Sequence, residues 1–202
     1  MSIFLLLLQF FLSLLLFFFF FWRRLKTDFE SPVIFRSGFL MIMGLGIGEL
    51  LFVNLIPRLF PASSIFSYTG LWFWGALTGL SIGFVVSQRV FELPLYEAFE
   101  AAVVGFLFAS PILTREWVYS AIALACYYYL RGRYKSFMWY KSGKVGFAGL
   151  VTLGLFFLVR SILALSGSNM LVFTGIGKVE VVLCAALSFL CFFAVYNLSE
   201  SV

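Results

Sequence analysis

Two charged side chains, Glu49 and Arg160, fall inside long apolar segments of the sequence. A charge within a lipid bilayer is costly, so such a residue either is paired or takes part in function. Counted from the predicted outer ends of their segments, both lie about six or seven residues deep, which is roughly 10 Å at the 1.5 Å rise of a helix. Two interpretations follow. The residues form an ion pair that clamps two helices, or the Arg160 guanidinium binds a lipid phosphate, whose geometry suits its paired N–H donors.

Side chains that commonly carry acid–base or metal chemistry are scarce. The chain contains no histidine, so imidazole is excluded both as a general base and as a metal ligand. The three cysteines lie in apolar segments without metal-ligand spacing, which is typical of small buried hydrophobes. The sequence therefore predicts no cofactor and no metal site.

Residues near predicted helix ends give weaker candidates. Glu97 and Glu100 share one face at the start of a predicted helix, where the helix dipole stabilises carboxylates. We expect a structural role for them, paired with Arg36, and a proton relay is the alternative. Trp72 and Trp74 near another helix end either pack at the membrane interface or line a lipid groove.

The composition points to a membrane as the main solvent. Hydrophobic residues make up 63% of the chain and charged residues only 11%, whereas soluble domains carry about 25% charged residues. Apolar runs of about 20 residues, long enough to cross a hydrocarbon core as a helix, recur along the chain. We predict an all-α fold with one membrane-embedded domain over residues 1–202. The basic residues gather at the ends of the runs, which argues against a nucleic-acid partner.

The apolar runs predict a polytopic protein with about seven transmembrane helices, in an inner or plasma membrane. The predicted spans are 3–22, 33–56, 68–87, 94–113, 117–130, 145–166 and 179–197. Alternate threading places most of the basic residues on one side, which the positive-inside rule makes cytoplasmic. The N-terminus is then outside and the C-terminus inside. Because Arg23, Arg24 and Lys26 follow the first run, we expect that run to be a retained anchor and not a signal peptide. Its phenylalanine-rich residues 17–21 are expected to contact lipid.

Glycines recur at intervals of four in the third predicted span, at Gly75, Gly79 and Gly83. Such a ladder lies on one face of a helix and lets another backbone approach closely. We therefore expect this helix to be central. Gly44 and Gly48 repeat the spacing in the second span and predict close packing there as well.

A series of short segments, in order from about residue 5 to residue 197, shares the pattern of one known family. They are the basic exit of the first helix at 23–24, a glycine-rich stretch at 46–54, a Gly-Leu-Trp-Phe-Trp-Gly element within 70–79, an acidic helix opening at 95–99, Val118-Tyr119, a helix end at 154–160, and a glycine-containing helix entry at 175–178. In these segments the chain resembles the bacterial prolipoprotein diacylglyceryl transferases, as a divergent and shortened member.

The resemblance implies an enzyme that transfers a diacylglyceryl group from phosphatidylglycerol to a cysteine thiol of a lipoprotein precursor, at the outer face of the cytoplasmic membrane. Its partners would be this anionic phospholipid and a lipobox peptide. Arg160 matches an arginine of the family, and we expect it to bind the lipid phosphate in a site shared with Glu49, Trp74 and Tyr119.

Departures from the family pattern leave the catalysis open. Trp74 stands at the position of the catalytic histidine, Phe156 replaces a tyrosine, Ala164 replaces an acidic residue, and residues 106–113 lack the Gly-Arg-x-Gly-Asn signature. No catalytic residue is therefore assigned. The chain is either a divergent transferase or a lipid- or partner-binding relative that has lost catalysis. A small channel or transporter is a third interpretation with less support, because few charges lie deep and no inverted repeat is evident.

Overall fold

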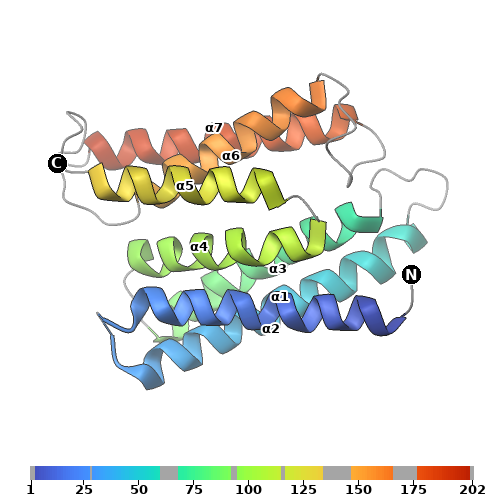
Figure 1. Ribbon diagram of the computed structural model, residues 1–202, viewed down its shortest axis with the longest axis horizontal. Helices are drawn as coiled ribbons and strands as arrows, with labels where there is room; N and C mark the ends of the chain where they lie inside the picture. Colours follow the sequence, from blue (N-terminus) through green and yellow to red (C-terminus); the bar gives the residue numbers. More distant parts are fainter. Residues whose placement is uncertain are drawn as a thin grey trace.

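The computed structural model shows α-helices packed side by side in an elongated bundle (Figure 1). It describes residues 3–27, 29–59, 68–91, 95–114, 117–133, 147–165 and 177–200. Within these ranges there are seven helices and no strand, which confirms the all-α prediction for this part of the chain. The helices are α1 (Ile3–Leu25), α2 (Ser31–Leu59), α3 (Tyr68–Phe91), α4 (Leu95–Thr114), α5 (Trp117–Arg133), α6 (Phe147–Leu165) and α7 (Gly177–Glu200).

Three of the described helices are long and apolar enough to cross a bilayer, at Leu7–Leu25, Ser31–Leu59 and Phe147–Leu165. Large hydrophobic side chains are exposed along much of the outer surface of the described helices. Such a surface is unfavourable in water and is expected where helices face lipid. The chain is therefore a membrane protein.

Helix α4 lies in the middle of the bundle and packs against α1, α3, α5 and α6. The prediction that α3 is central is wrong, since α3 packs mainly against α2 and to a lesser extent against α4. The reason lies in how much of each helix is buried. The glycines of α3 share one face, which packs against α2, whereas every residue of α4 from 101 to 107 is buried, so that α4 has neighbours on all sides. Ala101, Gly105 and Ala109 share one face of α4, and this small-residue face lets α1 approach closely, with Phe17 next to Gly105.

The interface between α2 and α3 is built from glycine on both sides, as the two glycine repeats predicted. A Cβ atom added at Gly75 would lie 2.7 Å from the carbonyl oxygen of Gly48, and one added at Gly83 would lie 2.7 Å from that of Leu40. The backbones of the two helices are thus in direct contact. A buried hydrogen bond between the hydroxyls of Ser37 and Ser87 extends the same interface.

The phenylalanine-rich part of α1 faces both the core and the outside. Phe17 and Phe21 are fully buried, whereas Phe19 is 48% exposed. The ring of Phe20 stacks on Phe108 of α4. The run therefore does more than contact lipid, because Phe17 and Phe21, one helical turn apart, form part of the hydrophobic core and Phe17 lies next to Gly105 of α4.

Candidate functional site

Arg160 lies in α6 with its side chain buried inside the bundle and 1% exposed. It is five residues from the end of α6 at Leu165, which is roughly 8 Å along the helix. Its guanidinium carbon lies 4.9 Å from the ring centre of Phe73 in α3 and 5.5 Å from that of Phe156, one turn earlier in α6. Two aromatic faces therefore hold the cation in place by cation–π attraction.

Trp74 belongs to the same cluster. Its indole ring stacks on Phe157 of α6, with ring centres 6.5 Å apart, and meets Phe73 edge to face at 5.3 Å. Trp74 is 6% exposed, so it lies inside the bundle and not at an interface with water. The structure thus brings Trp74 and Arg160 together through their shared contact with Phe73.

Glu49 of α2 is fully buried, and neither of its carboxylate oxygens has a hydrogen-bond partner among the described residues. Its backbone faces α3 at Gly75, where an added Cβ would lie 2.8 Å from the Cα of Glu49. Gly75 and Phe73 point in directions about 160° apart around the helix, since two steps at 3.6 residues per turn rotate by about 200°. Glu49 and Arg160 therefore lie on opposite sides of α3, and the ion pair of the clamp interpretation is not formed.

Tyr119, the fourth residue of the predicted lipid-phosphate site, lies in the first turn of α5. Its side chain is outside the part of the chain that the structure describes, as are those of Trp72 and Glu97. The predicted meeting of Tyr119 with Arg160 stays a prediction.

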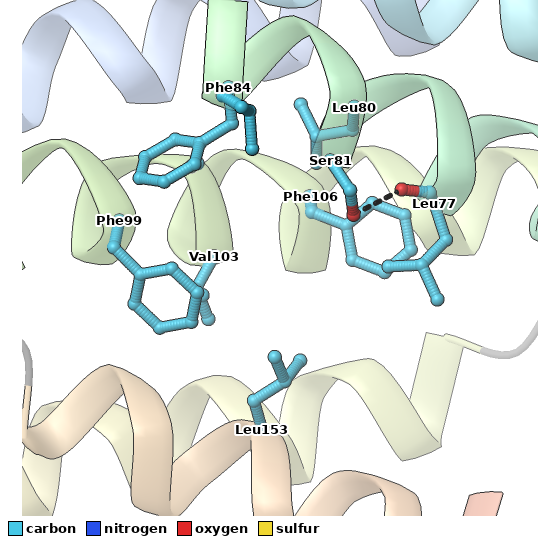
Figure 2. Close-up of a pocket in the computed structure, with 10 residues that line it drawn as sticks. Leu77, Leu80, Ser81, Phe84, Phe99, Val103, Phe106 and Leu153 are labelled. Atoms are coloured by element: carbon cyan, nitrogen blue, oxygen red, sulfur yellow. Dashed lines mark hydrogen bonds between the residues drawn. The ribbon is translucent and has the colours of Figure 1, made fainter. Parts of the chain in front are cut away.

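A pocket of about 190 Å³ opens beside this cluster, between α3, α4 and α6 (Figure 2). Exposed Ser81 lies at its outer edge and buried Val103 at its inner wall. The Ser81 hydroxyl donates a hydrogen bond to the carbonyl of Leu77 at 2.8 Å, so the lining offers little polarity to a ligand. Phe106, another lining residue, touches Phe73 with ring centres 5.6 Å apart. Two aromatic side chains, Phe106 and Phe73, thus lie between the pocket and Arg160.

A second charged cluster lies at the other end of the bundle. Glu100 of α4 forms an ion pair with Arg24 of α1, with Nη2 2.9 Å from Oε2, and the Tyr127 hydroxyl donates to the same oxygen at 3.4 Å. The predicted partner Arg36 is exposed instead. Sequence reasoning did not select Arg24 or Tyr127, because Arg24 and Glu100 are 76 positions apart and only the packing of α1 on α4 brings them together.

These contacts suit binding better than bond making. A buried guanidinium next to an apolar pocket can hold the phosphate of a lipid while a chain of that lipid fills the pocket. No family model, curated protein or solved structure matches this chain. The described residues also contain no cluster of three potential metal ligands. The interpretation of the site therefore depends on its geometry and its residue types.

Proposed function

We propose that this chain is a multi-pass membrane protein that binds an anionic phospholipid such as phosphatidylglycerol, with the phosphate at Arg160 and part of an acyl chain in the pocket between α3, α4 and α6. The observation that carries the proposal is the burial of Arg160 inside an apolar helix beside that pocket. A buried charge in a membrane helix is by default a candidate functional site, and a guanidinium is suited to bind a phosphate.

The size of the pocket supports this assignment. Its volume is about 190 Å³, and an apolar cavity of about 150 Å³ is enough to hold a benzene-sized molecule. The exposed side chains of Ser81 and Val85 border it on the outside of the bundle. In a membrane this opening faces lipid, so an acyl chain reaches the pocket without crossing water.

The proposed orientation has seven spans, an external N-terminus and a cytoplasmic C-terminus. Successive helices run in alternating directions along the bundle (Figure 1). This direction pattern places the basic ends of α1, α3 and α5 at one end of the molecule, and the positive-inside rule assigns that end to the cytoplasm. Arg160 then lies near the outer leaflet. The resemblance to diacylglyceryl transferases implies a phospholipid-binding site on the same side of the membrane.

Reporter fusions test the orientation. We expect fusions after Lys26, Arg89 and Lys144 to report a cytoplasmic location, and fusions after Ser64 and Ser168 to report an external one, because each pair of successive spans returns the chain to the same side. Paired alkaline phosphatase and green fluorescent protein fusions give the two opposite signals. A cytoplasmic signal at Ser64 would show that the proposed number of spans is wrong.

Removal of the Arg160 charge tests the lipid site. We expect purified Arg160→Gln to retain at least about tenfold less phosphatidylglycerol than the wild type, since a charge-assisted bidentate contact contributes about 1.5–3 kcal/mol. Arg160→Lys should recover only part of the binding because the planar fork is lost. Bound lipid is measured by mass spectrometry of the extracted protein. Arg58→Gln is the matched control, because Arg58 is exposed in the last turn of α2, at the same end of the bundle.

A second variant tests the pocket without touching the buried charge. Ser81→Phe places a ring at the outer edge of the pocket and should also lower the retained lipid, while leaving thermal stability near that of the wild type. Unchanged phosphatidylglycerol in both Arg160→Gln and Ser81→Phe would contradict the proposal. Glu49→Gln should not restore lipid to Arg160→Gln, because the two side chains do not contact each other.

We propose that the protein binds the phospholipid but does not transfer its diacylglyceryl group. Transfer of a diacylglyceryl group to a cysteine needs an acceptor for the thiol proton, and Trp74 occupies the position where the resembling transferases hold a histidine. An indole N–H donates a hydrogen bond but cannot accept a proton. A mass increase of a lipobox peptide incubated with the protein and phosphatidylglycerol would show that transfer has survived.

A further inference from the structure

A second pocket, of about 180 Å³, lies between α1, α4 and α5, next to the basic last turns of α1 and α5. Three arginines and two tyrosines contribute to its lining: Arg23 and Arg24 from the last turn of α1, and Tyr127, Tyr128 and Arg131 from α5. The lipid site proposed above uses none of these residues.

The inner part of this pocket is fixed by buried contacts. The ion pair with Glu100 holds Arg24, whose side chain is 9% exposed, and Tyr127 is fully buried and bonded to the same carboxylate oxygen. Arg24 is therefore held in one position before any ligand arrives. Preorganised charged groups bind a ligand with less loss of side-chain entropy than free ones.

The outer part offers cations that are not engaged elsewhere. Arg23 and Arg131 are exposed, and neither forms a hydrogen bond or an ion pair with any residue that the structure describes. Other basic residues at this end behave differently, since Lys26 lies over the ring of Trp22 and Arg133 over that of Tyr129. The two arginines thus add free guanidinium groups to a pocket that already contains a fixed one.

The charge of the pocket selects an anion. Three arginines and one carboxylate leave a net charge of 3 − 1 = +2, which matches the −1.5 to −2 carried by a phosphate monoester at about pH 7. Guanidinium groups bind phosphate oxygens through paired N–H donors, and tyrosine hydroxyls add further donors. Basic pockets between membrane helices on the cytoplasmic side suit lipid head groups of this kind.

We propose that the pocket between α1, α4 and α5 binds a phosphate monoester through Arg23, Arg24 and Arg131. Two sources provide this chemistry: the head group of a phosphatidic-acid-like lipid in the adjacent leaflet, or phosphate in solution. The site is distinct from Arg160 in position and in ligand charge, so the protein contacts anionic groups at both ends of the bundle.

The test uses the full chain purified in detergent, with one arm for each source. Thermal unfolding is followed in inorganic phosphate and in chloride at equal ionic strength, and native mass spectrometry measures binding of phosphatidic acid against phosphatidylcholine. In the variant Arg23→Gln/Arg131→Gln we expect binding to fall about 10- to 30-fold, since each basic residue near an anionic lipid contributes about a factor of five. Arg24 is left in place so that its ion pair still supports the fold.

The controls separate a pocket from general surface charge. Arg36→Gln removes an exposed arginine that does not line the pocket and should bind as the wild type does, and Arg23→Lys/Arg131→Lys should recover part of the affinity. Stabilisation by inorganic phosphate would assign a soluble ligand, and binding of phosphatidic acid alone would assign a lipid. Equal losses in Arg36→Gln and the double glutamine variant, or no preference for phosphate in either arm, would overturn the proposal. Arg160→Gln should keep this binding, which separates a failure here from a failure of the lipid site.

Discussion

Gly79→Ile is expected to lower the free energy of unfolding by at least about 3 kcal/mol, which is a large share of the stability of a typical domain. The cause is the contact between the backbones of α2 and α3. A Cβ at position 79 would lie 2.8 Å from the carbonyl carbon of Gly44 and 2.9 Å from the Cα of Gly48. Both neighbours are backbone atoms, so no side-chain rotation relieves the overlap, and the two helices must separate.

Thermal or denaturant unfolding in detergent, followed by tryptophan fluorescence, measures the effect. Gly132→Ile is the matched control, because a Cβ added at Gly132 meets no atom within 4 Å. It should leave stability unchanged or raise it by about 0.5 kcal/mol through better helix propensity. Equal melting of Gly79→Ile and the wild type would mean that α2 and α3 do not pack through their glycines.

The helices and the glycine contact could be predicted because both depend on local information. The length of an apolar run shows whether it can cross the membrane as a helix. The spacing of four residues places Gly75, Gly79 and Gly83 on one face of α3. The helix ends were less predictable. The α3 helix continues to Phe91 and not to residue 87, because its backbone hydrogen bonds persist after the apolar pattern has ended.

The arrangement of the helices could not be predicted in the same way. Glu49 and Arg160 were expected at similar depth, and their contacts with α3 at Gly75 and at Phe73, two positions apart, place them at similar levels. Depth follows from position along a helix, but the face that each residue meets depends on which side of α3 its helix packs. The ion pair failed as a prediction for this reason. The central place of α4 was missed although its small residues gave a signal, since Ala101, Gly105 and Ala109 also recur at intervals of four.

The second large effect is expected at the ion pair between Arg24 and Glu100, whose side chains are 9% and 3% exposed. Glu100→Leu should destabilise the protein by about 3–5 kcal/mol, since it leaves the buried Arg24 without its opposite charge. Arg24→Met should have a similar effect because the carboxylate then keeps only the hydrogen bond from Tyr127. Arg36→Met should change stability by no more than about 0.5 kcal/mol, as expected for an exposed side chain.

The double variant Arg24→Met/Glu100→Leu decides between a buried pair and two independent contributions. Replacement of a whole buried pair by apolar residues of similar volume is often neutral or stabilising, because both desolvation penalties disappear together. We therefore expect the double variant to be more stable than either single variant, with a coupling energy of at least about 2 kcal/mol in the unfolding cycle. Additive losses would show that Arg24 and Glu100 do not act as a pair. A large loss of stability in Arg36→Met would instead support the pairing of Arg36 with Glu100 that the sequence predicted.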